Sequence, residues 1–156
     1  MTQFMTPLEE AIARTRIAAT VARYNAAVDV GDVDGVMTTF DHEAVLTPSK
    51  GVYAGAAAIR EFYEIVVGDK RMDADKPKPL LRHGLTTHLV EFTSAERATG
   101  RLYYMVSTVL GHDHTGLYED EFIRRGEEWL IYRRRILIEW FASPSWFEQR
   151  RLRAAK

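Results

Sequence analysis

The strongest constraint on the fold is a change in the pattern of apolar residues near Leu80. Before it, apolar residues recur at helical spacing, whereas after it β-branched and aromatic residues dominate. Four segments of this second kind are separated only by the short turns SAE, HDHTG and RGEE. Such turns join neighbouring strands as hairpins, so the four strands are expected to form an antiparallel meander. Helices followed by a meander predict the α+β class.

The first helix is expected over residues 6–31. Thr6 can cap it, Pro7 suits the first helical position, and Glu9 lies three residues after Thr6, as in a capping box. Gly31 follows as the natural left-handed stop. One face carries an apolar stripe at helical spacing, made of Ile17, Val21, Tyr24 and Val28.

The other elements follow from cap and turn signals. A second helix is expected over 32–40, as a tight hairpin with the first, and a third over 56–68. Between them, 43–55 is predicted to form two short extended pieces around a turn. The charged, proline-containing segment 69–79 is expected to be a loop, and 143–155 a short C-terminal helix.

The composition excludes several classes of protein. At 156 residues, the chain is expected to form one domain over residues 1–156. A net charge of −1 favours neither nucleic acid nor an anionic membrane as a partner, and no apolar run is long enough to span a bilayer. The absence of cysteine excludes disulfides, cysteine–zinc sites and cysteine nucleophiles. We therefore expect a cytoplasmic protein.

Signatures of cofactor and metal sites are missing as well. No phosphate loop, dinucleotide fingerprint or Ser-His-Asp motif occurs, and no cofactor is expected. The HDH sequence at 112–114 places two histidines at i and i+2, a spacing that suits metal binding on a strand. It lies at a predicted hairpin tip with no third ligand in view, so we expect a solvated turn and no metal site.

Asp29 lies near the end of the first helix, where the negative end of the helix dipole disfavours a carboxylate by roughly 0.3–1 kcal/mol. It shares a helical stripe with Ala18, Ala22 and Asn25, so small residues are followed by two polar ones. This stripe can form a pocket wall in which Asn25 binds a substrate. The alternative is an ordinary exposed residue beside Gly31.

His83 opens the first strand of the meander. A lone histidine at such a place is commonly a half-exposed residue without a function. To act as a general base, it needs a carboxylate that orients the imidazole ring and raises its basicity. Asp29 is the natural candidate for that partner, although the sequence does not give the distance between them.

Arg134 is the middle residue of an RRR run in the last strand. Simple alternation places it on one face with Tyr132, Ile136 and Trp140. An arginine among such side chains needs a carboxylate partner, which Asp120 on the neighbouring strand could provide. The alternative is that Arg134 binds an oxygen or leaving group of a substrate. Four aromatic residues are candidates for lining a pocket, with plain core or a subunit interface as the alternative: Tyr53, Tyr104, Tyr118 and Trp140.

The order and spacing of five segments resemble the nuclear transport factor 2-like superfamily, in its SnoaL-like branch. The segments are RYNAAVDVGDVDGVMTTFDHEA, GVYAGAAAIREFY, RHGLTTHLVEF, GLYEDEFIRRGEEWLIYRRR and the EWF that follows. The resemblance implies an α+β fold in which a cone-shaped, curved antiparallel sheet and three N-terminal helices enclose an apolar pocket. It says less about the reaction, because this fold hosts dehydratases, isomerases, cyclases and non-catalytic subunits.

The resemblance also implies roles for four residues. His83 matches the catalytic histidine of hexachlorocyclohexane dehydrochlorinase and bile acid 7α-dehydratase, and Asp29 falls where members keep its acid partner. Tyr24, otherwise a core residue, falls where dehydratases such as scytalone dehydratase keep a tyrosine as hydrogen-bond donor or general acid. The dehydrochlorinase has a lysine there, which favours an oxygen over a halide as the group handled. Arg134 matches an arginine of the dehydrochlorinase pattern.

These implications predict a cofactor-independent lyase of the dehydratase kind, acting on a small apolar steroid, terpenoid, polyketide or xenobiotic. Alternatives are an isomerase like ketosteroid isomerase or a polyketide cyclase. A non-catalytic class, such as a ligand-binding protein or a dioxygenase small-subunit-like assembly protein, also stays open. A homodimer or homotrimer is expected, because the outer sheet face is predicted to expose Ile131, Leu137 and Phe141.

Overall fold

The computed structural model describes residues 4–68 and 80–148. The loop expected at 69–79 and most of the C-terminal helix expected at 143–155 lie outside the described residues. Helices and strands follow in an order that confirms the predicted α+β class. They are α1 (Pro7–Val30), α2 (Val33–Met37), β1 (Phe40–Thr47), β2 (Tyr53–Ala54), α3 (Ala56–Gly68), β3 (Leu81–Phe92), β4 (Arg97–Thr108), β5 (Gly111–Arg125) and β6 (Glu128–Phe141).

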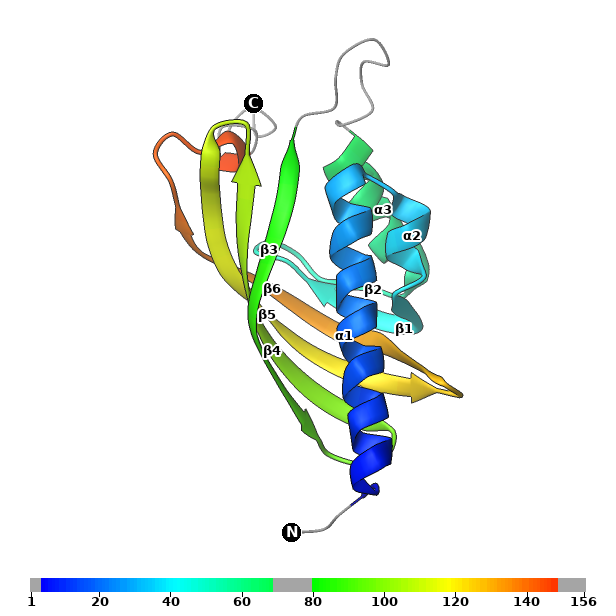
Figure 1. The fold of residues 1–156 in the computed structure, drawn as a ribbon. Coiled ribbons are helices and arrows are strands. Elements are labelled where there is room, and N and C mark those ends of the chain that lie inside the picture. The colour runs from blue at the N-terminus through cyan, green and yellow to red at the C-terminus, as the bar shows by residue number, and fades with distance from the viewer. Residues whose placement is uncertain (1–3, 69–79, 149–156) are drawn as a thin grey trace.

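Six strands form one curved sheet in the order β2-β1-β6-β5-β4-β3. The predicted antiparallel meander is confirmed for β3 to β6, whose neighbours pair antiparallel. The sequence did not reveal that β1 runs parallel to β6, because no turn joins these two distant strands. All three helices lie on the same side of the sheet, with α1 running along it (Figure 1). That side is the inner face, where the core and the cavity lie.

The first helix has the predicted ends. The Thr6 hydroxyl accepts the Glu9 N–H at 3.3 Å, while the Glu9 carboxylate accepts the Thr6 N–H at 2.8 Å. Gly31 ends the helix with a φ of 73°, in the left-handed region that glycine adopts most easily. The Thr20 hydroxyl donates to the Trp129 carbonyl at 2.6 Å and fixes the helix against the last strand. The predicted apolar stripe is buried: Ile17, Val21, Tyr24 and Val28.

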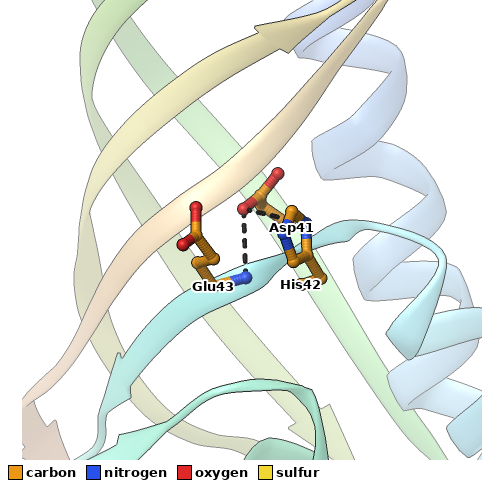
Figure 2. Close-up of side chains that lie close together, drawn as sticks. All are labelled: Asp41, His42 and Glu43. Atoms are coloured by element: carbon orange, nitrogen blue, oxygen red, sulfur yellow. Dashed lines mark hydrogen bonds and ion pairs between the residues drawn. The ribbon is translucent and has the colours of Figure 1, made fainter.

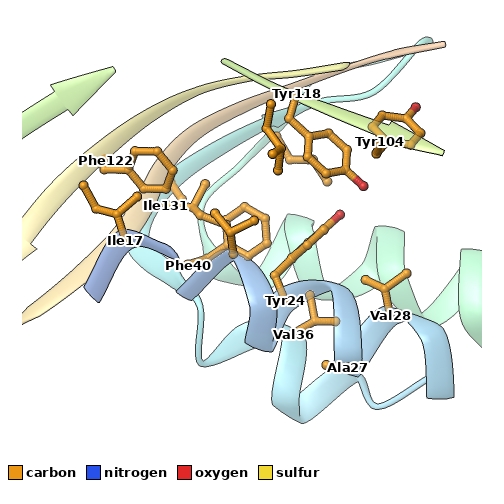
Figure 3. Packing of buried hydrophobic residues seen from close by; sticks show 14 of the residues in the cluster. Ile17, Tyr24, Ala27, Val28, Val36, Phe40, Tyr104, Tyr118, Phe122 and Ile131 are labelled. Atoms are coloured by element: carbon orange, nitrogen blue, oxygen red, sulfur yellow. The ribbon is translucent and has the colours of Figure 1, made fainter. Parts of the chain in front are cut away.

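The second helix is shorter than predicted. Asp32 caps it as expected, but it ends at Met37 and Phe40 already begins β1. The aromatic ring of Phe40 packs edge-on against Tyr24 at 5.9 Å (Figure 3). Beside this pair, Ile17, Phe122 and Ile131 fill the core between α1 and the sheet (Figure 3). Within residues 4–68 and 80–148, no helix is both long and apolar enough to cross a membrane.

A β-bulge in β6 changes which residues face inward. Phe122 pairs with Ile131, but the preceding Glu121 pairs with Arg133, so Tyr132 is an extra residue on β6. Ile131 is therefore fully buried in the core, whereas simple alternation had predicted it on the outer face. The prediction of one uninterrupted alternation along the strand was wrong, because it did not include the bulge.

A second bulge has the same effect near the end of β6. Gly116 pairs with Ile138 and Thr115 with Trp140, which leaves Glu139 as the extra residue. Phe141 consequently turns inward and lies 5.7 Å from His114, between ring centres. The prediction that Phe141 is on the outer face was therefore wrong as well. Of the three apolar residues predicted there, Leu137 alone stays on that face.

Candidate functional site

A cavity of about 320 Å³ lies between the helices and the inner face of the sheet. Its wall is mainly aromatic and aliphatic, which suits a small apolar molecule. Five residues that sequence reasoning selected line it, namely Tyr24, Tyr53, His83, Tyr104 and Tyr118. Four others lie outside the lining, namely Asn25, Asp29, Arg134 and Trp140. Each of the four has a different reason for its position.

Asp29 lies directly behind His83. The His83 ring Nδ1 is 2.7 Å from the Asp29 carboxylate, which also accepts the backbone N–H of His83 at 3.2 and 3.3 Å. The two side chains are only 10% and 11% exposed. A carboxylate can only accept, so Nδ1 carries the hydrogen and the lone pair lies on Nε2. This is the arrangement of a general base with a fixed tautomer.

Asn25 does not form a pocket wall with its helical stripe. Ala18 and Ala22 are exposed, so the interpretation of this stripe as a wall was wrong. The buried Asn25 amide donates to the Val21 carbonyl at 2.9 Å, and its oxygen accepts the Tyr118 hydroxyl at 3.3 Å. Asn25 thus holds a cavity residue in place from behind.

Tyr24 and Tyr63 place two hydroxyl groups in contact at the cavity wall. Their oxygens are 2.6 Å apart, and either one can be the donor. Figure 3 shows Tyr24 rising from α1 toward Tyr118 on the sheet. Burial raises the pKa of all three tyrosines, against the influence of the nearby Arg134 guanidinium, so the hydroxyls stay protonated. Sequence reasoning missed Tyr63 as a site residue, because its spacing with Ile59, Phe62 and Val66 is that of an ordinary apolar helix face.

Arg134 is buried and paired with Asp120. Its Nε and Nη2 donate to the two carboxylate oxygens at 2.8 and 2.6 Å, and both side chains are 0% exposed. The guanidinium carbon lies 4.2 Å from the ring centres of both Tyr24 and Tyr118. Burial by itself would lower the pKa of Arg134, but the attraction of Asp120 outweighs burial and raises this pKa. Of the two alternatives, the structure has the ion pair, and Arg134 is not among the residues that line the cavity.

Tyr104 owes its position to a glycine on the next strand. Its hydroxyl donates to the Leu137 carbonyl at 3.0 Å, and its ring stacks on Tyr118 with 4.5 Å between centres. A Cβ at Gly116 would lie 2.7 Å from the Tyr104 hydroxyl and would collide with the Leu137 carbonyl. Gly116 therefore leaves the space that Tyr104 needs to lie over the sheet.

Of the two remaining residues that were predicted to line the pocket, one does and one does not. Tyr53 lines the cavity and packs on Phe62 at 4.8 Å between ring centres. Trp140 is 50% exposed and lies beside His112 on the outer side of the sheet. The prediction that Trp140 lines the pocket was wrong, because the bulge at Glu139 reverses its direction.

Asp113 and His114 are buried, although a solvated turn was predicted. His114 lines the cavity, and its Nδ1 is 2.8 Å from the Asp113 carboxylate. Sequence reasoning missed this pair because it placed 112–114 at a hairpin tip. Strand alternation could have revealed the inward direction of His114. It lies at an even spacing from Gly116, Tyr118 and Asp120, all of which face inward.

One group of three side chains in the described part of the chain has the spacing of metal ligands: Asp41, His42 and Glu43 (Figure 2). Arg125 already neutralises it, donating to both Asp41 oxygens at 2.8 and 3.3 Å and lying 3.5 Å from Glu43. The hydrogen bond from Arg125 lowers the pKa of Asp41 against the effect of burial. His42 is exposed, so this group is a surface ion pair and not a built cation site.

Comparisons with known proteins show the family and the fold of the chain. A family model described as "SnoaL-like domain" matches residues 9–135. Among solved structures, a variant of Rv3472, a protein of unknown function from Mycobacterium tuberculosis, is 27% identical, with a TM-score of 0.72 over 90% of this chain and 80% of that one. Curated proteins give no match.

Two further solved structures share the fold at lower identity. Hexachlorocyclohexane dehydrochlorinase LinA-type3 of Novosphingobium barchaimii is 20% identical, with a TM-score of 0.72 over 88% of this chain and 93% of that one. A candidate scytalone dehydratase of Novosphingobium aromaticivorans is 13% identical, with a TM-score of 0.74 over 88% and 91%. At these identities the likeness concerns the fold alone, which is the predicted cone.

Proposed function

The chain belongs to the SnoaL-like domain family, and from this premise we propose that it is a cofactor-independent lyase of the dehydratase kind. The proposed substrate is a small, mostly apolar molecule such as a steroid, terpenoid, polyketide or xenobiotic. The observation that carries the proposal is the contact between Asp29 and His83 at 2.7 Å on the wall of an apolar cavity.

His83 is the proposed base. With its Nδ1–H held by Asp29, the ring has one lone pair left, on Nε2, and His83 lines the cavity. A proton on a carbon next to a carbonyl can move to Nε2, and the Asp29 carboxylate then stabilises the imidazolium that forms. The imidazolium then gives this proton to the hydroxyl group that leaves the neighbouring carbon, so water is eliminated and His83 is neutral again.

The Tyr24–Tyr63 pair is the proposed donor. Two hydroxyls that share one hydrogen bond leave one O–H unused by the pair. That hydrogen can be donated to the oxygen on which charge develops as the proton leaves, and a donor fixed in advance lowers the barrier. Arg134 assists indirectly, because its charge beside the Tyr24 ring makes that hydroxyl a better donor than burial alone would allow.

The test is a panel of apolar β-hydroxy ketones with steroid, terpenoid and polyketide skeletons. Elimination of water gives an enone, whose ultraviolet absorbance reports turnover. We expect turnover by the wild type and by His112→Ala, a variant of an exposed histidine outside the cavity, and its loss in His83→Ala. Unchanged turnover in His83→Ala would refute the assignment. Migration of the double bond in a β,γ-unsaturated ketone added to the panel, with no loss of water from the β-hydroxy ketones, would support the isomerase alternative instead.

We also propose that the protein is a homo-oligomer assembled through the outer sheet face. Tyr103, Leu117 and Leu137 form a row across three strands there, and Met105, Thr115 and Trp140 form the next row. Tyr103, Met105 and Trp140 are 41%, 44% and 50% exposed, which is much apolar surface in one place.

Charge on the same face supports contact with a second copy. The adjoining row is Arg101, Glu119 and Arg135, whose mixed signs can be matched by a copy related by two-fold symmetry. Light scattering should give a dimer or trimer mass that falls to a monomer in Tyr103→Lys. The control Leu110→Lys, at an exposed hairpin end, should keep the wild-type mass. A monomeric wild type would refute this part.

A further inference from the structure

We propose that His114, held by Asp113, is the hydrogen-bond acceptor that selects substrates carrying a hydroxyl or N–H donor on the same cavity wall as His83, two strands away from it. The inference rests on the proposed function in taking this cavity as the substrate site. It adds a specificity-determining residue and narrows the substrate class. An apolar molecule with a donor group near the reacting carbon should bind better than one without it.

Asp113 is built as a fixed anion. Its carboxylate accepts the His114 Nδ1–H at 2.8 Å, the Ser145 hydroxyl at 3.0 Å, and the backbone N–H groups of Trp146 and Phe147 at 2.5 and 3.4 Å. Burial by itself would raise the pKa of Asp113, but these donors hold it below its usual range. A carboxylate with donors on both oxygens keeps its charge and its orientation.

This anion fixes the tautomer of His114. Because Nδ1 donates to Asp113, Nε2 is the ring atom with a lone pair. In the part of the chain that the structure describes, Nε2 has no hydrogen-bond partner. Burial lowers the pKa of His114, and it outweighs the opposing influence of Asp113. The ring is therefore a neutral acceptor at neutral pH, packed between Tyr104 and Phe147.

His83 and His114 face the same cavity from one face of the sheet, two strands apart. His83 on β3 pairs with Val106 on β4, which pairs with His114 on β5. Residues paired in this way share a face, and two strand spacings separate their backbones by about 10 Å. The centre of the Tyr104 ring lies 5.9 Å from that of His83 and 6.1 Å from that of His114. A ligand one or two rings wide can reach both nitrogens.

The other polar groups nearby do not offer the same acceptor. The Tyr104 and Tyr118 hydroxyls already donate to the Leu137 carbonyl and to Asn25. The Tyr24–Tyr63 pair has an O–H left over and so suits an acceptor on the ligand. His83 is assigned to the reacting carbon. The tyrosine oxygens and the Ser49 hydroxyl, which also lines the cavity, can accept as well, but a neutral imidazole nitrogen is a stronger acceptor than a hydroxyl oxygen. His114 Nε2 is therefore the group that best matches a ligand hydroxyl.

The test compares the binding of inert ligand pairs in which a methyl group replaces the hydroxyl hydrogen: thymol and its methyl ether, and estrone and its methyl ether. The wild type should bind the hydroxyl member more tightly by roughly three- to tenfold, the range expected for one net hydrogen bond. In His114→Phe the ratio should fall to about one. In His114→Gln, whose amide oxygen can accept, part of the preference should return.

Two matched controls assign the preference to one histidine. His83→Phe and His112→Phe should both keep the wild-type ratio. A wild type without a preference for either hydroxyl member overturns the proposal. So does a preference that survives in His114→Phe, or one that is lost in His83→Phe.

A second measurement needs no ligand. Nitrogen-15 NMR of the histidine rings in the intact protein should show, for His114 at neutral pH, a protonated Nδ1 and a bare Nε2. A protonated Nε2 overturns the proposal even where a variant folds poorly. Binding of inert ligands does not depend on turnover, so the two proposals can fail separately. If His114→Phe loses the preference while His83→Ala keeps activity, the proposed function fails and this inference stands. If His114→Phe keeps the preference while His83→Ala loses activity, this inference alone fails.

Discussion

The Asp29 carboxylate holds His83 twice, through the ring Nδ1 at 2.7 Å and through the backbone N–H at 3.2 Å. The second contact attaches the end of α1 to the start of β3, so the carboxylate cannot turn away without breaking a link between two elements. This also accounts for an acidic residue near a helix C-terminus, where the dipole alone is unfavourable. The contact with His83 offsets that cost.

Asp29→Asn should abolish most activity while leaving the fold intact. The amide can keep a hydrogen bond with the backbone of His83, but its N–H group disfavours the Nδ1–H tautomer and it carries no charge to stabilise the imidazolium. We expect a fall in turnover of about 10²–10⁴-fold. Circular dichroism should show an unchanged spectrum. Wild-type turnover in this variant would mean that the dyad is structural.

Tyr63→Phe should lower turnover by about a hundredfold if the tyrosine pair donates to the developing charge. Removing one hydroxyl leaves the Tyr24 hydroxyl without the partner that orients it. The substrate KM should change much less than kcat, since the donor acts mainly in the transition state. Tyr53→Phe, at a more exposed place in the wall, is the matched control and should leave kcat near its wild-type value.

Arg134→Leu should destabilise the fold by about 3–5 kcal/mol, because it leaves the Asp120 carboxylate buried without a partner. The double variant Asp120→Leu with Arg134→Leu should recover much of that loss. Urea unfolding measures both. A loss in the double variant equal to the sum of the losses in Arg134→Leu and in Asp120→Leu alone would show that the two residues are not coupled.

Gly116→Ala should cost about 1–3 kcal/mol of unfolding free energy and should displace the Tyr104 ring. The new methyl group would collide with the Leu137 carbonyl and the Tyr104 hydroxyl. Gly84→Ala is the control, since a Cβ there meets only one backbone oxygen at an ordinary 3.7 Å. Near-ultraviolet circular dichroism should report the change in tyrosine packing. A neutral Gly116→Ala would mean that the strand can shift to accommodate it.

Acidification should destabilise the protein partly through His114. Burial lowers the pKa of His114 in the folded state below its ordinary 6.5, so the unfolded chain binds the proton more readily. The contribution of His114 to folding stability is therefore complete above pH 6.5. It is lost as the pH falls through the lower pKa that His114 has in the folded state. Urea unfolding between pH 7 and about pH 5 should show a smaller loss in His114→Gln than in the wild type. His112→Gln should behave like the wild type.

Local signals in the sequence determined the ends of α1 and the order of the elements. The Thr6–Glu9 capping box, the stop at Gly31 and the turns of the meander depend on neighbours in the chain, so they could be read directly. The pairing of Asp29 with His83 was a hypothesis from the residue types, and the family resemblance favoured it. The residues alone left an exposed Asp29 equally open.

Tertiary structure alone decided the rest, because it depends on strand register. Two bulges in β6 bury Ile131, turn Trp140 outward and bring Phe141 inward, and no local pattern marks an extra residue in a strand. Register also aligns His83, Val106 and His114 in one row, which places a second histidine in the cavity. A one-residue shift in a strand exchanges its two faces, so the sequence supplied the residues and the sheet selected those that line the cavity.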